Sequence, residues 1–341
     1  MMRKRILLIV LGTVASGCRP EVGAPISQIN GPAILAVKSI PAEAYPRSDE
    51  RVVTYEALAV DSGGRVPAQR TDISYPLPLL WAMCDQPKPP TESNAVSASC
   101  VDSYAGPGEP GSTPNTYSAP VDTEACRLFG PTIPPAKEGE PPLRARDPDI
   151  TNGYYQPVRV ELVAPEELRR AGMSTSDSVI AFHMQRIYCG LADAKREDIV
   201  RYEKEYKANN NPVLASLTVQ TPDGAPLDLP ASAAPPAAIP VPVGQTISLT
   251  ANWPAESVET YPAKDPITRE LVTHFESMRV SWFSSGGSFE HDVTGRGEEE
   301  VENYAENTWQ SETTGLVHIW VVLNDARGGT DFASLDLEVT P

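Results

Sequence analysis

The stretch Leu316-Val317-His318-Ile319-Trp320-Val321-Val322-Leu323, followed by Asn324-Asp325-Ala326-Arg327-Gly328-Gly329, decides the fold class of this chain. Apart from His318, its first eight residues are apolar and several are β-branched, which predicts a buried strand. The Asn, Asp and Gly residues after them predict a hairpin turn, and Phe332–Val339 predicts the strand that returns. The stretch therefore favours an all-β body.

The C-terminal half contains three more predicted strands, at Val213–Val219, Gln245–Trp253 and Met278–Phe283. A Pro/Ala-rich crossover at 221–242 and a Ser/Gly turn at 284–288 separate them. With Trp282 as a core tryptophan, a long central strand and a glycine-bearing hairpin, residues 212–341 resemble bacterial immunoglobulin-like domains. The resemblance implies a β-sandwich without a cysteine pair between its two sheets.

Residues 32–208 predict an N-terminal β-rich domain, with strands at Ile34–Ile40, Arg51–Val60, Leu79–Cys84, Tyr154–Val163 and Ser178–Cys189. We interpret this domain as a second sandwich, with Trp81 as the counterpart of Trp282. The stretch 85–152 is rich in Pro, Gly, Ser and Thr and keeps no helix or strand period, so we interpret it as a long surface insertion. The fold class is thus all-β, with two immunoglobulin-like sandwiches in tandem.

Two helices are expected in the N-terminal half. Pro165–Gly172 has Pro near its start and Gly past its end, which is typical of a short helix. Ala192–Asn209 carries Ile199, Tyr202 and Tyr206 at helical spacing. The Asn-Asn-Asn-Pro run that follows predicts the end of this helix and a boundary between the two domains.

Composition limits the function. Among 341 residues there are 35 prolines, which excludes long helices over most of the chain, and the formal net charge is -17. A nucleic-acid partner is disfavoured because phosphate binding needs a basic face. The simplest reason for the acidity is solubility.

The N-terminus carries a predicted export signal, residues 1–17. A basic start at Arg3-Lys4-Arg5 precedes an apolar run, and Ala15-Ser16-Gly17 leads into Cys18. One alternative is a transmembrane helix, but the apolar run is too short for a membrane span, which needs roughly 20 apolar residues. The other alternative is a plain secreted protein. The segment resembles the lipobox of bacterial lipoproteins, with Ala15 where Leu is usual. The resemblance implies that Cys18 becomes the acylated first mature residue.

The lipobox resemblance carries further expectations. Residue 19 is Arg rather than Asp, so the inner-membrane retention signal of such lipoproteins is absent, and an outer-membrane location is expected. Residues 18–31 are interpreted as a tether between the lipid and the folded body.

The four remaining cysteines predict two disulfides, because an even number in an exported chain is typical of disulfide pairing. They are Cys84, Cys100, Cys126 and Cys189, and three connectivities are possible. We expect Cys84–Cys189 to tie two core strands and Cys100–Cys126 to close the loop between them. Their spacing does not fit a zinc site.

Metal ligands are scarce in the sequence. Asp147, Asp149 and Asn152 ahead of Gly153 are a calcium candidate, although an Asx-rich turn explains the same residues. The histidines lack metal-site spacing, and His183 and His318 are interpreted as strand residues. No cofactor is expected.

The sequence therefore predicts a membrane-anchored exported lipoprotein with a non-catalytic binding or structural role at the cell envelope. Its expected partners are the membrane, through the lipid, and a protein or glycan at the cell surface. No nucleophile elbow, phosphate loop or dinucleotide motif is present. The alternative is a secreted carbohydrate- or cell-wall-active hydrolase whose carboxylates pair only in space.

Overall fold

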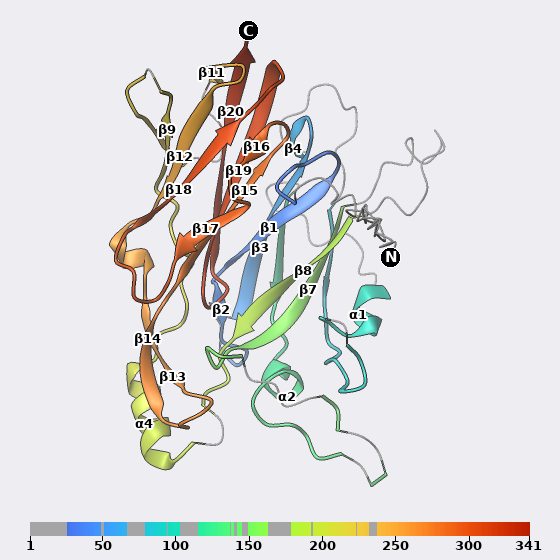
Figure 1. Cartoon of the computed structure of the whole chain (residues 1–341). Coiled ribbons are helices and arrows are strands. Elements are labelled where there is room, and N and C mark those ends of the chain that lie inside the picture. The colour runs from blue at the N-terminus through green and yellow to red at the C-terminus, as the bar shows by residue number, and fades with distance from the viewer. Residues whose placement is uncertain are drawn as a thin grey trace, which may run out of the picture.

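The computed structural model of the chain describes residues 26–48, 51–66, 79–93, 95–102, 115–136, 138–139, 142–144, 149–162, 179–191, 194–222, 224–231 and 237–341. Two β-sandwiches, one N-terminal and one C-terminal, make up this part of the chain (Figure 1). The expected all-β class with two sandwiches in tandem is confirmed. Residues 1–17 and the short helix expected at Pro165–Gly172 lie outside the described residues.

The C-terminal sandwich has two five-stranded sheets. One has the order β10-β9-β12-β18-β16, formed by Leu227–Pro230, Ser216–Gln220, Thr246–Asn252, Tyr304–Gln310 and Ser288–Phe289. The other has the order β11-β20-β19-β15-β17, formed by Ile239–Pro242, Thr330–Thr340, Gly315–Asp325, Met278–Ser284 and Val293–Arg296. Strands β9, β12, β18 and β16 follow the A-B-E-D order of an immunoglobulin sandwich and β15, β19 and β20 follow C-F-G, with β10, β11 and β17 added at the sheet edges.

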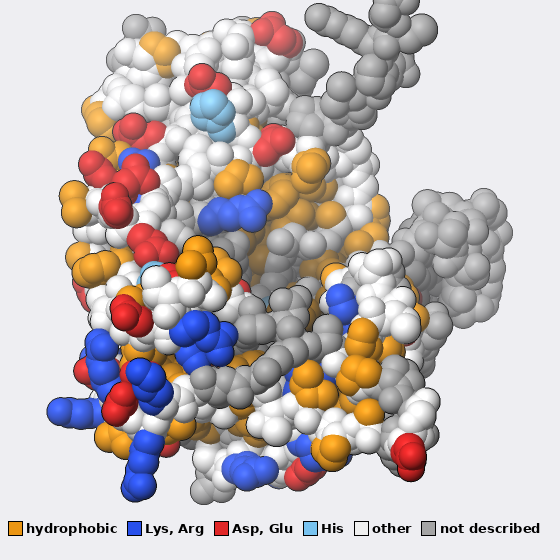
Figure 2. All heavy atoms as spheres, turned by 60° about the horizontal axis from the view of Figure 1, so that its bottom comes forward, with side chains coloured by type: hydrophobic (Ala, Val, Ile, Leu, Met, Phe, Trp, Pro, Cys, Tyr) orange, Lys and Arg blue, Asp and Glu red, His pale blue; other side chains and the backbone are white. Residues whose placement is uncertain are grey.

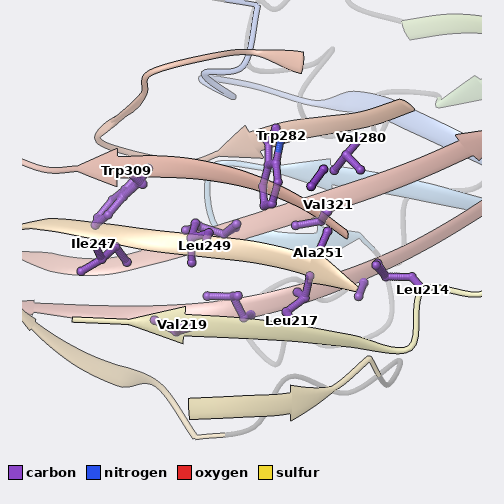
Figure 3. Packing of buried hydrophobic residues seen from close by; sticks show 14 of the residues in the cluster. Leu214, Leu217, Val219, Ile247, Leu249, Ala251, Val280, Trp282, Trp309 and Val321 are labelled. Atoms are coloured by element: carbon purple, nitrogen blue, oxygen red, sulfur yellow. The ribbon is translucent and has the colours of Figure 1, made fainter. Parts of the chain in front are cut away.

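The core of this sandwich lies between its two sheets. Strands β12 and β18 alternate buried and exposed residues because only one face of their sheet is covered. Trp282 from β15 and Trp309 from β18 fill the space between the sheets beside Leu249 (Figure 3). The strands predicted from the sequence supply the residues of this core. Side chains alternate between the two faces of a strand, so apolar residues at every second position lie on the buried face.

The N-terminal sandwich has two smaller sheets. In one, β3 pairs with β1, β4 and β6, formed by Val52–Asp61, Ala33–Ile40, Gly64–Val66 and Thr116–Pro120. The other has the order β2-β8-β7-β5, formed by Glu43–Ala44, Val179–Ile187, Tyr154–Leu162 and Leu79–Met83. Its core includes Tyr55, Trp81 and Val160.

The two sandwiches repeat one topology. Strand β2 runs parallel to β8 and is followed by β7 and β5, just as β11 runs parallel to β20 and is followed by β19 and β15. Trp81 on β5 and Trp282 on β15 therefore occupy equivalent strands, and each lies opposite a valine of the next strand, Val160 and Val321. Both tryptophans are buried.

The predicted insertion at 85–152 is partly wrong. It contains helices α1 (Ala98–Asp102) and α2 (Ala125–Leu128), and β6 is a strand of the N-terminal sandwich. Tyr117 and Ala119 pair with β3, and Val121 is fully buried. The stretch lacks a strand period because β6 has only five residues and ends at Pro120, so too few residues alternate to reveal it.

Other boundaries also differ from the expected ones. The helix predicted at Ala192–Asn209 is α4, Arg196–Glu205. The hairpin of β13 (Thr260–Lys264) and β14 (Leu271–Phe275) and a short 3-10 helix at Ala255–Ser257 were not expected. The hairpin extends from the C-terminal sandwich to α4 (Figure 1). None of the helices in the described part of the chain has the length and apolar character of a membrane span.

A shared hydrophobic cluster joins the two sandwiches. Leu58 and Val60 of β3 pack with Trp320 and Val322 of β19, together with Ile29. The other face of each strand points into its own sandwich core. Within these strands the runs Ala57–Val60 and Ile319–Leu323 are apolar without a break, and every residue in them is buried, because both faces of each run are covered.

The tether expected at 18–31 is wrong at its C-terminal end, because residues 27–29 belong to the folded body. Ile29 N donates to Ser284 O and Ser284 N donates to Ser27 O, each at 2.8 Å, so this segment adds to the edge of β15. Ser27 and Ile29 are buried. Residues 18–25 lie outside the described residues.

Candidate functional site

An open groove of about 800 Å³ lies at the end of the N-terminal sandwich where β2 and β8 finish. Four segments line it: the residues after β2, helix α2 with the proline-rich run that follows, the residues after β8, and α4. The lining residues are Tyr45, Pro46, Arg47, Ser48, Glu124, Cys126, Arg127, Pro131, Thr132, Ile133, Pro134, Pro135, Tyr188, Cys189, Gly190 and Glu203.

Local strand pairing places these segments together. Glu43 and Ala44 pair in parallel with Arg186 and Ile187, so both chains leave the sheet at the same end. Tyr188 N donates to Ala44 O at 2.9 Å and extends this pairing by one residue. Parallel strands place equivalent chain ends at one edge of a sheet, which is why residues so distant in sequence share one groove.

Tyr45 and Tyr188 form one wall of the groove and belong to a series of four tyrosine rings. The ring centroids of Tyr45 and Tyr188 are 4.8 Å apart, and Tyr188 is 5.4 Å from Tyr206, which stacks on Tyr202 at 4.6 Å. Tyr45 and Tyr188 are half-buried, and burial raises the pKa of the Tyr188 hydroxyl. Each ring is supported by the next, so the wall presents aromatic surface with little conformational freedom left to lose on binding.

Charged side chains border this aromatic wall. Arg47 is exposed, and Arg127 Nε lies 2.8 Å from Glu124 Oε2 in a solvent-exposed pair. Glu203 of α4 raises the pKa of Tyr188 further. Figure 2 turns this end of the molecule toward the reader and shows Lys and Arg side chains gathered at the lower left, where α4 lies. The groove combines apolar surface with a few polar groups, the composition of a binding site.

The expected disulfide connectivity is wrong. Cys84 pairs with Cys100 and Cys126 pairs with Cys189, with Cα–Cα distances of 5.6 and 5.4 Å. Cys84 and Cys189 follow β5 and β8, which are separated by β7 in their sheet, so these two cysteines are too far apart to pair. All four predicted cysteines form disulfides, and Cys126–Cys189 closes one wall of the groove.

The calcium candidate residues have protein partners. Asp149 Oδ2 accepts hydrogen bonds from Tyr155 Oη at 2.8 Å and from the Thr151 hydroxyl, and Asn152 bonds to the backbone of Lys264 in β13. Asn152 N donates to Asp149 O at 2.8 Å, which is the turn that the alternative interpretation predicts. Asp147 lies outside the described residues. Within the described ranges, no group of three or more His, Cys, Asp or Glu is arranged to hold a metal ion.

His183 and His318 lie on strands, as expected. His183 of β8 packs edge-on to Tyr55, and burial lowers its pKa to about 4. His318 of β19 is 2.8 Å from Asp336, and its ring faces Gly64 of the other sandwich. Gly64 has a φ of 120°, so the backbone of this hairpin turn favours glycine. A Cβ there would lie 3.5 Å from the imidazole, in ordinary van der Waals contact.

A buried network of charged groups occupies the junction between the sandwiches. We call it the junction network, and its members are Glu43, Arg186, Tyr206, Asn209, Glu259, Glu276, Asp325 and Arg327. Tyr206 Oη donates to Glu43 at 2.6 Å, and Arg186 Nη2 donates to Tyr206 Oη at 3.3 Å. The backbone N–H of Asn209 donates to Glu43 Oε2 at 2.9 Å, and its side-chain amide donates to Asp325 Oδ2 at 3.2 Å.

Arg327 is the centre of the C-terminal half of the junction network. Its side chain is fully buried, and Nε and Nη2 each donate at 2.6 Å, to Glu276 and Glu259. Nη1 donates to Lys207 O at 2.9 Å. Burial and the nearby Asp325 together raise the pKa of Glu276 to about 7, against the opposing effect of Arg327.

Sequence reasoning missed the groove and the junction network. Tyr45 and Tyr188, which form the groove wall, are 143 positions apart, and nothing local marks either as functional. Glu259 and Glu276 belong to the unexpected hairpin region. The one available signal was the Asn-Asn-Asn-Pro run, which was interpreted only as a helix end.

Comparisons with known proteins give distant likenesses. No family model and no curated protein matches the chain. Among solved structures, the D0-D1 domain of intimin is 10% identical, with 90% of this chain and 99% of that chain covered and a TM-score of 0.21. Fibronectin(III)-like modules of Clostridium thermocellum CbhA are 11% identical, with coverage of 91% and 94% and a TM-score of 0.20. The Yersinia pseudotuberculosis adhesin InvE is 11% identical, with coverage of 93% and 62% and a TM-score of 0.20; the chain thus spans just under two thirds of that adhesin. The fold assignment rests on strand order.

Proposed function

We propose that this chain is an exported lipoprotein, anchored to the outer membrane through Cys18, with a non-catalytic binding or structural role at the cell envelope. The observation that carries the location is the lipobox-like Ala15-Ser16-Gly17-Cys18 after a basic and apolar leader. The two disulfides support it independently, because disulfides persist in oxidising compartments outside the cytoplasm.

The shape of the folded body supports a binding role. The groove wall of Tyr45 and Tyr188 is preorganised by the contact between the two tilted rings and by a disulfide. The two sandwiches share a hydrophobic cluster and a buried charge network, so the groove is held on a stiff support. A protein or glycan at the cell surface is the proposed partner, bound against the tyrosine rings with the flanking charges setting its orientation.

The Cys18→Ser variant tests the anchor. Each buried CH₂ of an acyl chain contributes about 0.8 kcal/mol of membrane affinity, and several chains on one residue make the attachment nearly permanent. Removing the thiol removes the attachment site, so the variant should leave the membrane fraction. Fractionation, together with mass spectrometry of the mature N-terminus, measures both consequences.

The Arg19→Asp variant is the matched control for this experiment. It keeps Cys18 and introduces the inner-membrane retention residue of the lipoproteins that the leader resembles, so the protein should stay acylated and move to the inner-membrane fraction. A Cys18→Ser protein that still fractionates with membranes, or a wild-type mature N-terminus without fatty acid, would remove the anchor from the proposal.

A further inference from the structure

The two disulfides have different surroundings. Cys84 and Cys100 are 3% and 2% exposed and pack with Val96 and Phe182. Cys126 and Cys189 are half-buried, and both line the groove of about 800 Å³. A molecule small enough to enter the groove therefore reaches one disulfide and not the other.

Access matters because disulfide cleavage is a direct displacement at sulfur. A thiolate must approach one sulfur in line with the bond that breaks, so the rate depends on which sulfur can be reached. The charged side chains that line the groove around Cys126–Cys189 are Arg47 and Arg127, with Glu124 and Glu203. Their formal charges cancel, so a thiolate meets no net repulsion at this site, although the whole chain carries -17.

We propose that Cys126–Cys189 is a thiol–disulfide exchange site that accepts electrons from an external dithiol, whereas Cys84–Cys100 is a structural bond. The proposal uses the geometry of the groove and does not depend on which molecule the groove binds. It also does not depend on the lipid at Cys18.

The exchange takes place in two displacements. One thiolate of the dithiol attacks the sulfur of Cys126 or Cys189, a mixed disulfide forms, and the other cysteine leaves as a thiolate that takes up a proton. The second thiol of the reductant then attacks the mixed disulfide and releases the first cysteine. In total the protein disulfide gains two electrons and two protons, and the dithiol is oxidised to a disulfide.

Cleavage loosens the groove. The bond ties α2 to the end of β8 across a sequence separation of 63 residues, and α2 itself has only four residues. After reduction, α2 keeps the buried Ala125 but no longer has a covalent link to Tyr188 and its neighbours. The wall formed by α2 and the proline run is then free to move away from the tyrosine wall, so the redox state of this bond controls the width of the groove.

Native-state reduction tests the proposal. The purified mature chain is treated with dithiothreitol without denaturant, sampled over time, quenched by alkylation and mapped by peptide mass spectrometry. Cys126 and Cys189 should be alkylated at least ten-fold faster than Cys84 and Cys100, while far-UV circular dichroism stays native. Hydrogen exchange should accelerate at 121–135 and not in the C-terminal sandwich.

A groove-filling variant shows whether access sets the rate. Thr132→Trp places a large ring on an exposed lining position and should slow the reduction of Cys126–Cys189 several-fold. Ile267→Trp is the matched control, at a side chain that is 88% exposed in the turn between β13 and β14, and should leave the rate unchanged. Equal alkylation of all four cysteines, prior reduction of Cys84–Cys100, or a Thr132→Trp rate equal to that of the control would each overturn the proposal.

Discussion

Arg327 shows how one buried side chain holds the junction together. Its guanidinium reaches Glu276, Glu259 and the Lys207 carbonyl and lies 4.9 Å from the ring centre of Tyr261. A buried cation of this kind stabilises mainly by neutralising its partners, since each carboxylate alone would carry an uncompensated desolvation cost. The two carboxylates come from either side of the β13–β14 hairpin, so Arg327 also fixes where that hairpin lies.

At the residue scale, Arg327→Met should lower the free energy of unfolding by about 3–5 kcal/mol, because it leaves buried acidic groups without their counter-ion. Urea denaturation measures the change. Arg127→Met is the matched control: its pair with Glu124 is about half exposed, and its loss should cost less than about 1 kcal/mol. Equal costs for the two variants would show that the buried pair contributes no more than a surface one.

The linker Asn209-Asn210-Asn211 is the element on which the junction depends. Asn211 donates to Ser39 O at 2.7 Å at the end of β1 and accepts from Thr330 N at 2.8 Å at the start of β20. One amide thus bridges the two sandwiches with both of its hydrogen-bonding groups. The same run of asparagines that ends the helix also serves as the contact between the sandwiches.

At the element scale, Asn211→Ala should lower the unfolding free energy by about 1–3 kcal/mol, because it leaves a part-buried carbonyl and N–H unpaired. Asn211→Asp keeps the acceptor for Thr330 and loses the donor, so an intermediate cost is expected. Asn210→Ala, which removes an exposed contact with Glu259, should cost under about 1 kcal/mol. A thermal denaturation series on the three variants measures this order, and the reverse order would contradict the bridging role.

The whole molecule is held together by strands that are buried on both faces. Leu58 of β3 and Trp320 of β19 lie in the shared cluster, and Lys38 forms a 2.8 Å ion pair with Asp331 beside it. Arg65 lies over the ring of Phe332 at 5.5 Å. Apolar burial of this kind couples the stability of one sandwich to that of the other.

At this scale, Leu58→Ala should lower the stability of both sandwiches by about 2–5 kcal/mol in total, since a large buried side chain is replaced and a cavity remains. Hydrogen exchange followed by mass spectrometry should show lost protection in β19 and β20 as well as in β3. Val52→Ala on the same strand, at a side chain that is 53% exposed, is the control and should leave both sandwiches unchanged. Full protection of β19 in Leu58→Ala would mean that the sandwiches unfold independently.

Much of this architecture could be predicted from the sequence because it depends on local periodicity. The alternation in Gln245–Trp253 and the apolar run at Leu316–Leu323 each reflect the burial of their own strand. The apolar run also indicates that both faces of its strand are buried, because a strand of an antiparallel sheet with one face in solvent would alternate apolar and polar residues. The second face is the contact with the N-terminal sandwich.

The sequence alone predicted the all-β class, the tandem sandwiches and Trp81 as the counterpart of Trp282, and it led us to expect an exported, acylated chain. The cysteine pairing, the place of β6, and the groove formed by Tyr45, Cys126 and Tyr188 became evident only from the three-dimensional structure. The physical reason is distance along the chain. Periodicity reports what covers a residue within its own strand, whereas a pairing across 63 or 143 positions depends on strand order and packing that no local pattern contains.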